Sequence, residues 1–118
     1  MTIEADLLAV LEPFVDGRVY KMEAPPDVPR PYITYQQTGG QTLRFLENAL
    51  PSKKHGRFQL NLWADDAATV AAMALAVEGA IVLATAFQAE ALGAPVDVDG
   101  SMVDLFGQQQ DFGIWSER

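Results

Sequence analysis

An alternating run of apolar and polar residues passes directly into a helical pattern near the middle of the chain. The apolar members of the run, which point to one side of a strand, are Phe58, Leu60, Leu62 and Ala64. The other side of the same strand carries Arg57, Gln59, Asn61 and Trp63. Apolar residues then recur at helical spacing, at Val70, Met73, Ala74, Val77 and Ile81. The segment 57–81 therefore predicts a strand followed by an amphipathic helix that lies over one face of a sheet.

The first forty residues predict one helix and two extended segments. The expected elements are a helix at 5–11, an extended piece at 18–22, a proline-rich connector at 23–31 and a strand at 31–38. Thr2 is suited to the N-cap of the helix, and Pro13 marks its end. The connector holds four prolines between Pro25 and Pro31 and is typical of a polyproline-like segment that cannot join a sheet ladder.

The pattern after residue 81 is less regular. The segment 82–91 is compatible with a continued helix and with a strand; Gly79 weakens a helix, so we predict a strand. Residues 96–101 predict a loop or tight turn. The last strand is expected at 104–116, which contains Phe112 and Trp115 among its apolar residues. Together these segments predict five strands and two helices at most.

A long segment, 41–56, separates two predicted strands and is apolar for a solvated loop. Loops of this length in compact domains are usually functional or flexible. Two interpretations remain open: a short helix or hairpin folded onto the core, or an arm that docks on a neighbouring subunit. The candidate interface residues of this arm are Leu43, Arg44, Phe45, Leu46, Leu50, Lys53, Lys54 and His55.

The composition predicts one domain spanning residues 1–118, with 49% hydrophobic residues and enough chain for one core. No apolar run approaches the ~18 residues needed to cross a bilayer. The N-terminus has acidic residues where a signal peptide needs basic ones, so we expect a protein that is cytoplasmic when made. The absence of cysteine excludes disulfides, thiolate catalysis and cysteine-ligated zinc.

The net charge of −8 argues against nucleic-acid binding, which gains from a basic surface. The local exception is the basic run Lys53, Lys54, His55 and Arg57. This run is interpreted as a solvated loop or as a contact patch for an acidic partner. We expect no specific nucleic-acid binding and no membrane association.

No group of residues predicts catalysis, a metal site or a cofactor. Asp65 and Asp66, at a strand-to-helix junction, are best explained as an N-cap and a first-turn acid. The segment 97–104 fails the spacing of a calcium loop. An enzyme or small-ligand module, the rival interpretation, would need Asp65, Asp97 and His55 together in one pocket.

The order of the segments resembles the small tail completion, or tail-terminator-like, proteins of long-tailed phages and prophages. The matching marks are the short N-terminal helix followed by 17–20, the proline-rich connector, PYITY at 31–35, FQLNLWA at 58–64 with its Ala-rich helix, and DFGIW at 111–115. The resemblance implies an α+β fold with a mixed or mostly antiparallel sheet, here of four to five strands, and two helices packed on one face.

The resemblance also implies a structural, non-enzymatic role at the head–tail junction or tail end. The expected partners are other tail or connector proteins and further copies of the chain in a homo-oligomeric ring, for which a hexamer is one possibility. The expected location is the virion, and the host cytoplasm during assembly. A monomeric protein-binding adaptor is the alternative. We further predict that 42–54 forms an intersubunit or tail-facing arm.

Overall fold

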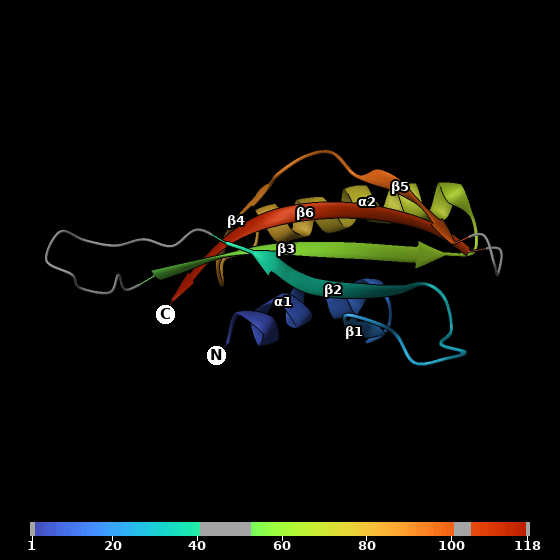
Figure 1. The fold of residues 1–118 in the computed structure, drawn as a ribbon, viewed down its shortest axis with the longest axis horizontal. Coiled ribbons are helices and arrows are strands. Elements are labelled where there is room, and N and C mark those ends of the chain that lie inside the picture. Colours follow the sequence, from blue (N-terminus) through green and yellow to red (C-terminus); the bar gives the residue numbers. More distant parts are fainter. Residues whose placement is uncertain (1, 41–52, 101–104, 118) are drawn as a thin grey trace, which may run out of the picture.

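The computed structural model describes residues 2–40, 53–100 and 105–117. In this part of the chain, six strands form one mixed sheet, and two α-helices cover one of its faces (Figure 1). The fold is therefore α+β, as predicted. The elements in chain order are α1 (Ile3–Leu11), a 3₁₀ turn (Glu12–Phe14), β1 (Val19–Lys21), β2 (Tyr32–Gly39), β3 (Lys53–Ala64), α2 (Ala67–Val82), β4 (Gln88–Ala91), β5 (Val96–Gly100) and β6 (Leu105–Glu117).

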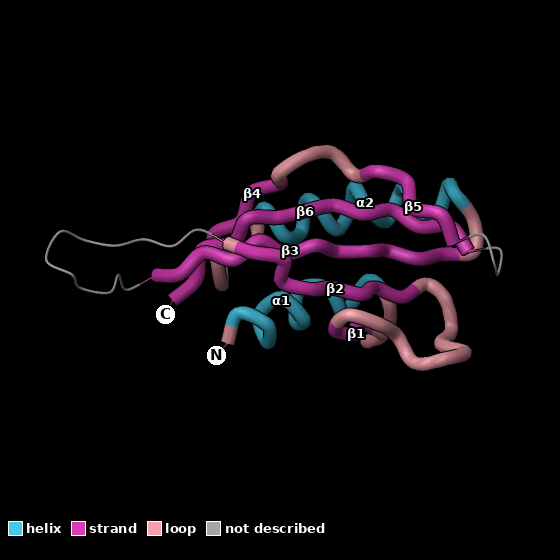
Figure 2. The backbone as a smooth tube through the Cα atoms, in the orientation of Figure 1, coloured by secondary structure: helices cyan, strands magenta, loops and turns pink. Residues whose placement is uncertain are grey.

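Two long antiparallel strands, β3 and β6, form the centre of the sheet (Figure 2). Their register runs from the pair Lys53 and Glu117 to the pair Ala64 and Phe106. On one side, β2 pairs antiparallel with β3, and the short β1 adds to β2 in parallel. On the other side, β4 and β5 pair with successive parts of β6. The strand order is β1-β2-β3-β6-β4, with β5 beside β4 on the same edge of β6.

The core lies between the helices and one face of the sheet. The alternation in β3 sets this face, because Phe58, Leu60 and Leu62 are buried while Gln59 and Asn61 are only half-buried on the other side. Both helices contribute to the same apolar cluster as these strand residues. The buried helix residues in that cluster are Leu7, Leu11, Val70, Ala74, Val77 and Ile81. The prediction that two helices pack on one face of the sheet is therefore confirmed.

Local signals explain how both helices begin. The Thr2 hydroxyl accepts a hydrogen bond from the Ala5 amide at 3.1 Å, which caps α1 as predicted. Asp66 caps α2, and its carboxylate accepts from the Thr69 amide at 2.7 Å. The sequence predicted an N-cap followed by a first-turn acid for the pair Asp65 and Asp66, but Asp65 precedes the cap and the first turn of α2 has no acid. The Asp65 carboxylate instead accepts a hydrogen bond from Arg30 at 3.1 Å.

The structure corrects three predictions of secondary structure. The helix α2 ends at Val82, one residue beyond the helical stripe predicted as far as Ile81, and residues 83–87 form a turn and bends where a strand was expected. Consequently the strand predicted at 82–91 is reduced to β4. Residues 96–100 form β5 and not a loop, because they pair with β6 in spite of the low strand propensity of aspartate. The sheet therefore has six strands where four to five were expected.

Candidate interaction surfaces

Part of the predicted arm is the beginning of a sheet strand. Lys53, Lys54 and His55 lie in β3 and pair with Glu117, Ser116 and Trp115 of β6. The ammonium of Lys53 also donates to the Glu117 carboxylate at 3.1 Å, and the rings of His55 and Trp115 lie 4.7 Å apart. The loop predicted at 41–56 is therefore wrong for 53–56, because cross-strand pairing stabilises this charged run as a strand.

The remaining candidate interface residues, Leu43, Arg44, Phe45, Leu46 and Leu50, lie outside the described residues. The positions where the chain leaves and re-enters the described part, Gly40 and Lys53, are at the same end of the sheet. Gly40 lies against the carbonyl of His55. The segment 41–52 is thus attached at both ends to one end of the β2–β3 pair.

An open hollow of about 400 Å³ lies at this end of the sheet. Its lining residues are Thr38, Gly39, Gly40, His55, Arg57, Glu90 and Leu92. Arg57 is engaged with Asp111, which accepts from its Nη2 at 2.7 Å and from its Nε at 3.1 Å. The Thr38 hydroxyl donates to the Arg57 carbonyl at 3.4 Å. The hollow therefore combines charges of both signs with polar groups already engaged within the sheet.

The three residues that a small-ligand or catalytic site would need, His55, Asp65 and Asp97, do not lie in one pocket. His55 lies near the beginning of β3, whereas Asp65 directly follows its last residue, Ala64. At about 3.3 Å per residue, this places them about 30 Å apart. Asp97 is engaged on β5, where it accepts from the Gln108 amide at 3.1 Å. These three side chains therefore cannot act on one ligand.

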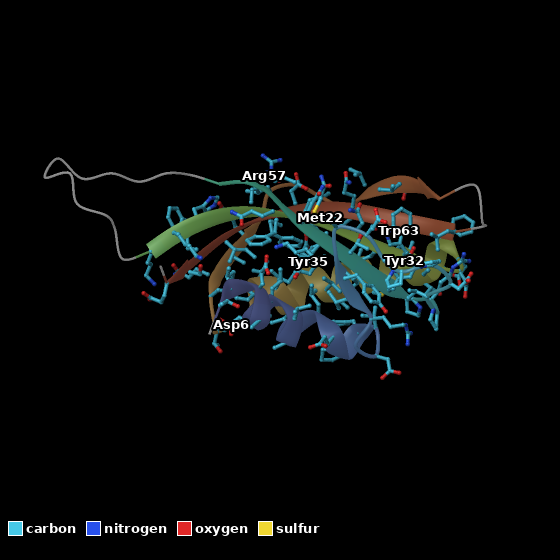
Figure 3. The ribbon with its side chains drawn as sticks, turned by 60° about the horizontal axis from the view of Figure 1, so that its bottom comes forward. Asp6, Met22, Tyr32, Tyr35, Arg57 and Trp63 are labelled. Atoms are coloured by element: carbon cyan, nitrogen blue, oxygen red, sulfur yellow. The ribbon has the colours of Figure 1, made fainter. Side chains whose placement is uncertain are left out.

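The sheet face away from the helices carries amides and aromatic rings. Two pairs of side-chain amides bridge neighbouring strands: Gln36 donates to Gln59, and Gln109 donates to Asn61, both at 3.0 Å. Toward the end of β3 opposite the 41–52 segment, Tyr32 and Trp63 lie together with ring centroids 6.4 Å apart, well away from Arg57 (Figure 3). Partial burial raises the pKa of the Tyr32 phenol.

The outer side of α2 is a surface that the sequence analysis did not predict. It presents exposed aliphatic residues at helical spacing, and Leu75 and Leu83 are 65% and 80% exposed. The small or aliphatic residues on this outer face of α2 are Ala68, Ala72, Leu75, Ala76, Gly79 and Val82, and the C-cap residue Leu83 continues the face. The signal was present in the sequence, because a helix that is apolar on every side is usually covered on every side.

A single charged residue lies within α2, and it points toward the sheet. Glu78 accepts a hydrogen bond from the amide of Gln110, which is only 5% exposed on the helix-covered face of β6. The same amide donates to the carbonyl of Gly93 at 2.8 Å. The only charge of α2 therefore fixes the helix to β6 and leaves its outer face uncharged.

Most of the described basic side chains are paired with acids at the surface. The ion pairs are Arg18 with Asp16, Lys21 with Glu4, Arg30 with Asp65, Lys53 with Glu117, and Arg57 with Asp111. Exposed pairs of this kind add little to stability, but they neutralise the cations. The described surface therefore offers little attraction for phosphate groups.

These features define an α+β domain whose exposed aliphatic residues on the outer side of α2 suit contacts with other proteins. A comparison with protein-family models identifies the family: residues 4–115 match the tail completion protein gp17 family, and the chain belongs to it. The resemblance seen in the sequence is thereby confirmed over nearly the whole chain. Membership makes this a structural protein of phage tail morphogenesis. No curated protein matches the chain. Among the described residues, no helix is long and apolar enough to cross a membrane.

Proposed function

We propose that the chain is a subunit of a homo-oligomeric ring that acts at the head–tail junction or the tail end of a phage or prophage particle. The observation that carries the proposal is the match to the tail completion family over residues 4–115. In this role the protein works by contacts with other copies and with tail or connector proteins, and it has no catalytic step. Its location is the virion, after assembly in the host cytoplasm.

The arrangement of the sheet supports a contact through the segment 41–52. This segment joins the end of β2 to the beginning of β3, and the residues that flank it, Gly40 and Lys53, lie at one end of the sheet. Its apolar residues, such as Phe45 and Leu46, suit a protein contact. A head-to-tail contact between copies generates a ring when the rotation closes.

The charge of the protein supports a position around a DNA passage. The net charge is −8, and the described cations are largely paired with acids. A wall of this charge repels DNA and lets it pass without adhesion. We therefore expect no binding of a DNA duplex even at low salt, and measurable low-salt binding would contradict a passage of this kind.

The experiment is to add purified, labelled protein to tails from particles that lack it, and to locate the label by electron microscopy. Label at one end of each tail supports the proposal, whereas label along the sides, or none, contradicts it. Sedimentation of the protein, alone and bound to tails, measures the number of copies. A single copy at each tail end would favour the monomeric adaptor over the ring.

A further inference from the structure

The sheet edge formed by β1 and β2 is closed to a further strand. The backbone groups of Val19 and Lys21 point away from β2, because those of the residues on either side bond to it. The Val19 amide donates at 3.0 Å to the carbonyl two residues earlier, and the Lys21 carbonyl accepts at 2.9 Å from the amide two residues later. Farther along the edge, the register of β2 shifts between Gln37 and Gly39, and the Gln37 side chain donates to the Gly39 carbonyl. Such shifts and engaged backbone groups hinder the pairing of a foreign strand.

The opposite edge of the sheet, at β5, is open. The Leu92 amide donates to the Asp111 carbonyl at 2.9 Å, so alternate residues of β6, counted from Asp111, direct their backbone groups toward this edge. Val96 and Val98 lie opposite two of these residues, and the intervening Asp97 therefore directs its amide and carbonyl away from the sheet. The strand β5 forms the margin of the sheet here (Figure 1). Within the described part of the chain, no backbone hydrogen bond uses the outward groups of Asp97.

The strand β5 lacks most of the features that protect edge strands. It contains no proline and no lysine, and its pairing with β6 runs without a register shift. On the sheet face without helices, Val96 is 55% exposed and Val98 is half-buried. An added strand can therefore bond to the backbone of β5 and pack apolar side chains beside the two valines.

The charge of β5 determines which kind of strand can pair there. The strand has aspartate at positions 97 and 99 and no basic residue. Residues that exchange hydrogen bonds in an antiparallel pair lie directly opposite each other, so a second copy of β5 would place aspartate opposite aspartate. The described partner of the Asp97 carboxylate, the Gln108 amide, is uncharged and does not neutralise it. A second copy is thus a poor occupant, since its other edge is closed.

We propose that β5 is the acceptor for an extended segment of a different protein, which adds a strand to the sheet. The segment has a basic residue opposite Asp97 and apolar residues beside Val96 and Val98. The proposal rests on the proposed contacts with tail or connector proteins and specifies one of them. Contacts between copies in the ring then use other surfaces.

Peptides can stand in for the segment in a direct test. A peptide of alternating valine and lysine, blocked at both ends, is added to isotope-labelled protein, and amide hydrogen exchange is followed by NMR. We expect exchange at the outward amide of Asp97 to slow by about tenfold or more in the bound state. The matched control is the amide of Lys21, which points outward at the closed edge and should exchange at an unchanged rate. A peptide methylated at alternate backbone nitrogens, which lacks the donors, should not bind.

Variants of Asp97 test the charge of the acceptor. A peptide with glutamate in place of lysine should bind the unaltered protein about fivefold more weakly. In Asp97→Lys this preference should reverse, and in Asp97→Asn, which keeps an acceptor for the Gln108 amide, it should narrow. Because Asp97 is exposed, both variants should retain the unfolding midpoint of the unaltered protein.

The outcomes separate this inference from the proposed function. A lysine peptide that slows no amide of β5, or that binds equally well when methylated, overturns the acceptor. Val98→Cys chains that cross-link to each other through β5 identify a second copy as the occupant and also overturn it. An Asp97→Lys chain that labels tail ends as well as the unaltered protein overturns the acceptor and leaves the proposed function intact. Unaltered protein that does not label tail ends overturns the proposed function, whatever the peptides show.

Discussion

The indole of Trp63 lies over Gly107, its partner across the β3–β6 ladder. A Cβ added at Gly107 would lie 2.6 Å from Cζ3 of the indole, a separation that real side chains do not tolerate. Tyr32, the partner of Trp63 on the other side, completes a row of contacts across three strands. An aromatic ring over a strand glycine covers exposed backbone and fixes the register of the pair. This row therefore stabilises the sheet on the face without helices.

The first prediction concerns Gly107→Ala. The new methyl group must displace the indole of Trp63, and we expect the free energy of unfolding to fall by about 1–3 kcal/mol. Urea denaturation measures the change. In a Trp63→Ala background the same substitution should cost much less, because the indole is gone. An equal cost in both backgrounds would show that the indole is not the cause.

The same substitution at a second glycine, Gly79, should raise the free energy of unfolding and not lower it. Gly79→Ala adds a methyl group to α2 where, apart from the helix's own backbone and the adjacent residues, no described atom lies within 4 Å of the new Cβ. The better helix propensity of alanine should raise the free energy of unfolding by up to about 1 kcal/mol. A loss of stability in the isolated protein would mean that the outer side of α2 is more crowded than the structure shows.

The fold was predictable where one face of an element is buried. The alternation from Phe58 to Ala64 identified β3 and its buried side, because period-two burial is visible in a single strand. The bounds of the short strand β4 and the existence of β5 were not predictable in this way. Both strands depend on pairing with β6, where Ala89 lies opposite Ile114 and Val96 lies opposite Gln109, and local propensity does not include such partners.

The candidate surfaces were predictable only in part. The run from Lys53 to Gly56 looks like a loop because of its charges and glycine, and only its register with β6 makes it a strand. The sequence did not predict the exposed outer face of α2 for a different reason. The spacing of Val70, Ala74 and Val77 identified the side of α2 that meets the sheet, but it did not show that the opposite side is also apolar and that Leu75 is exposed there.

The buried amide of Gln110 leads to a third prediction. Gln110→Leu removes the donor for Glu78 and for the Gly93 carbonyl, and both acceptors stay near the core. We expect a loss of about 1–3 kcal/mol in the free energy of unfolding. The control is Glu78→Gln, whose side-chain carbonyl still accepts from Gln110 and which should cost less. If the two variants lose the same stability, the Gly93 bond is irrelevant and the carboxylate charge dominates.

The Asp66 cap of α2 predicts that the stability of the folded protein depends on pH. The hydrogen bond from the Thr69 amide, followed by that from its hydroxyl, lowers the pKa of Asp66 below its usual range. Because the folded-state pKa is the lower one, the stabilisation is present above the unfolded value of about 4 and is lost as the pH falls through the folded value. Asp66→Asn keeps an acceptor but does not titrate there, so its urea midpoint should fall less between pH 5 and pH 2.5 than that of the unaltered protein. Parallel curves for the two proteins would rule out Asp66 as a source of the acid sensitivity.

The segment 41–52 provides the last prediction, which concerns proteolysis before and after assembly. The peptide bond after Arg44 lies within this segment, whereas those after Lys53 and Lys54 lie in or beside the ladder with β6, which protects a strand from a protease. In the unassembled protein, trypsin should therefore cleave after Arg44 before it cleaves after Lys53 or Lys54, as mass spectrometry of the fragments will show. In assembled particles the cleavage after Arg44 should slow markedly, because the segment is then covered by a neighbouring subunit. An Arg44→Gln chain, which lacks the site, gives the background rate at the two lysines. Equal cleavage after Arg44 in the free and the assembled protein would mean that the segment faces solvent in the particle and makes no contact there.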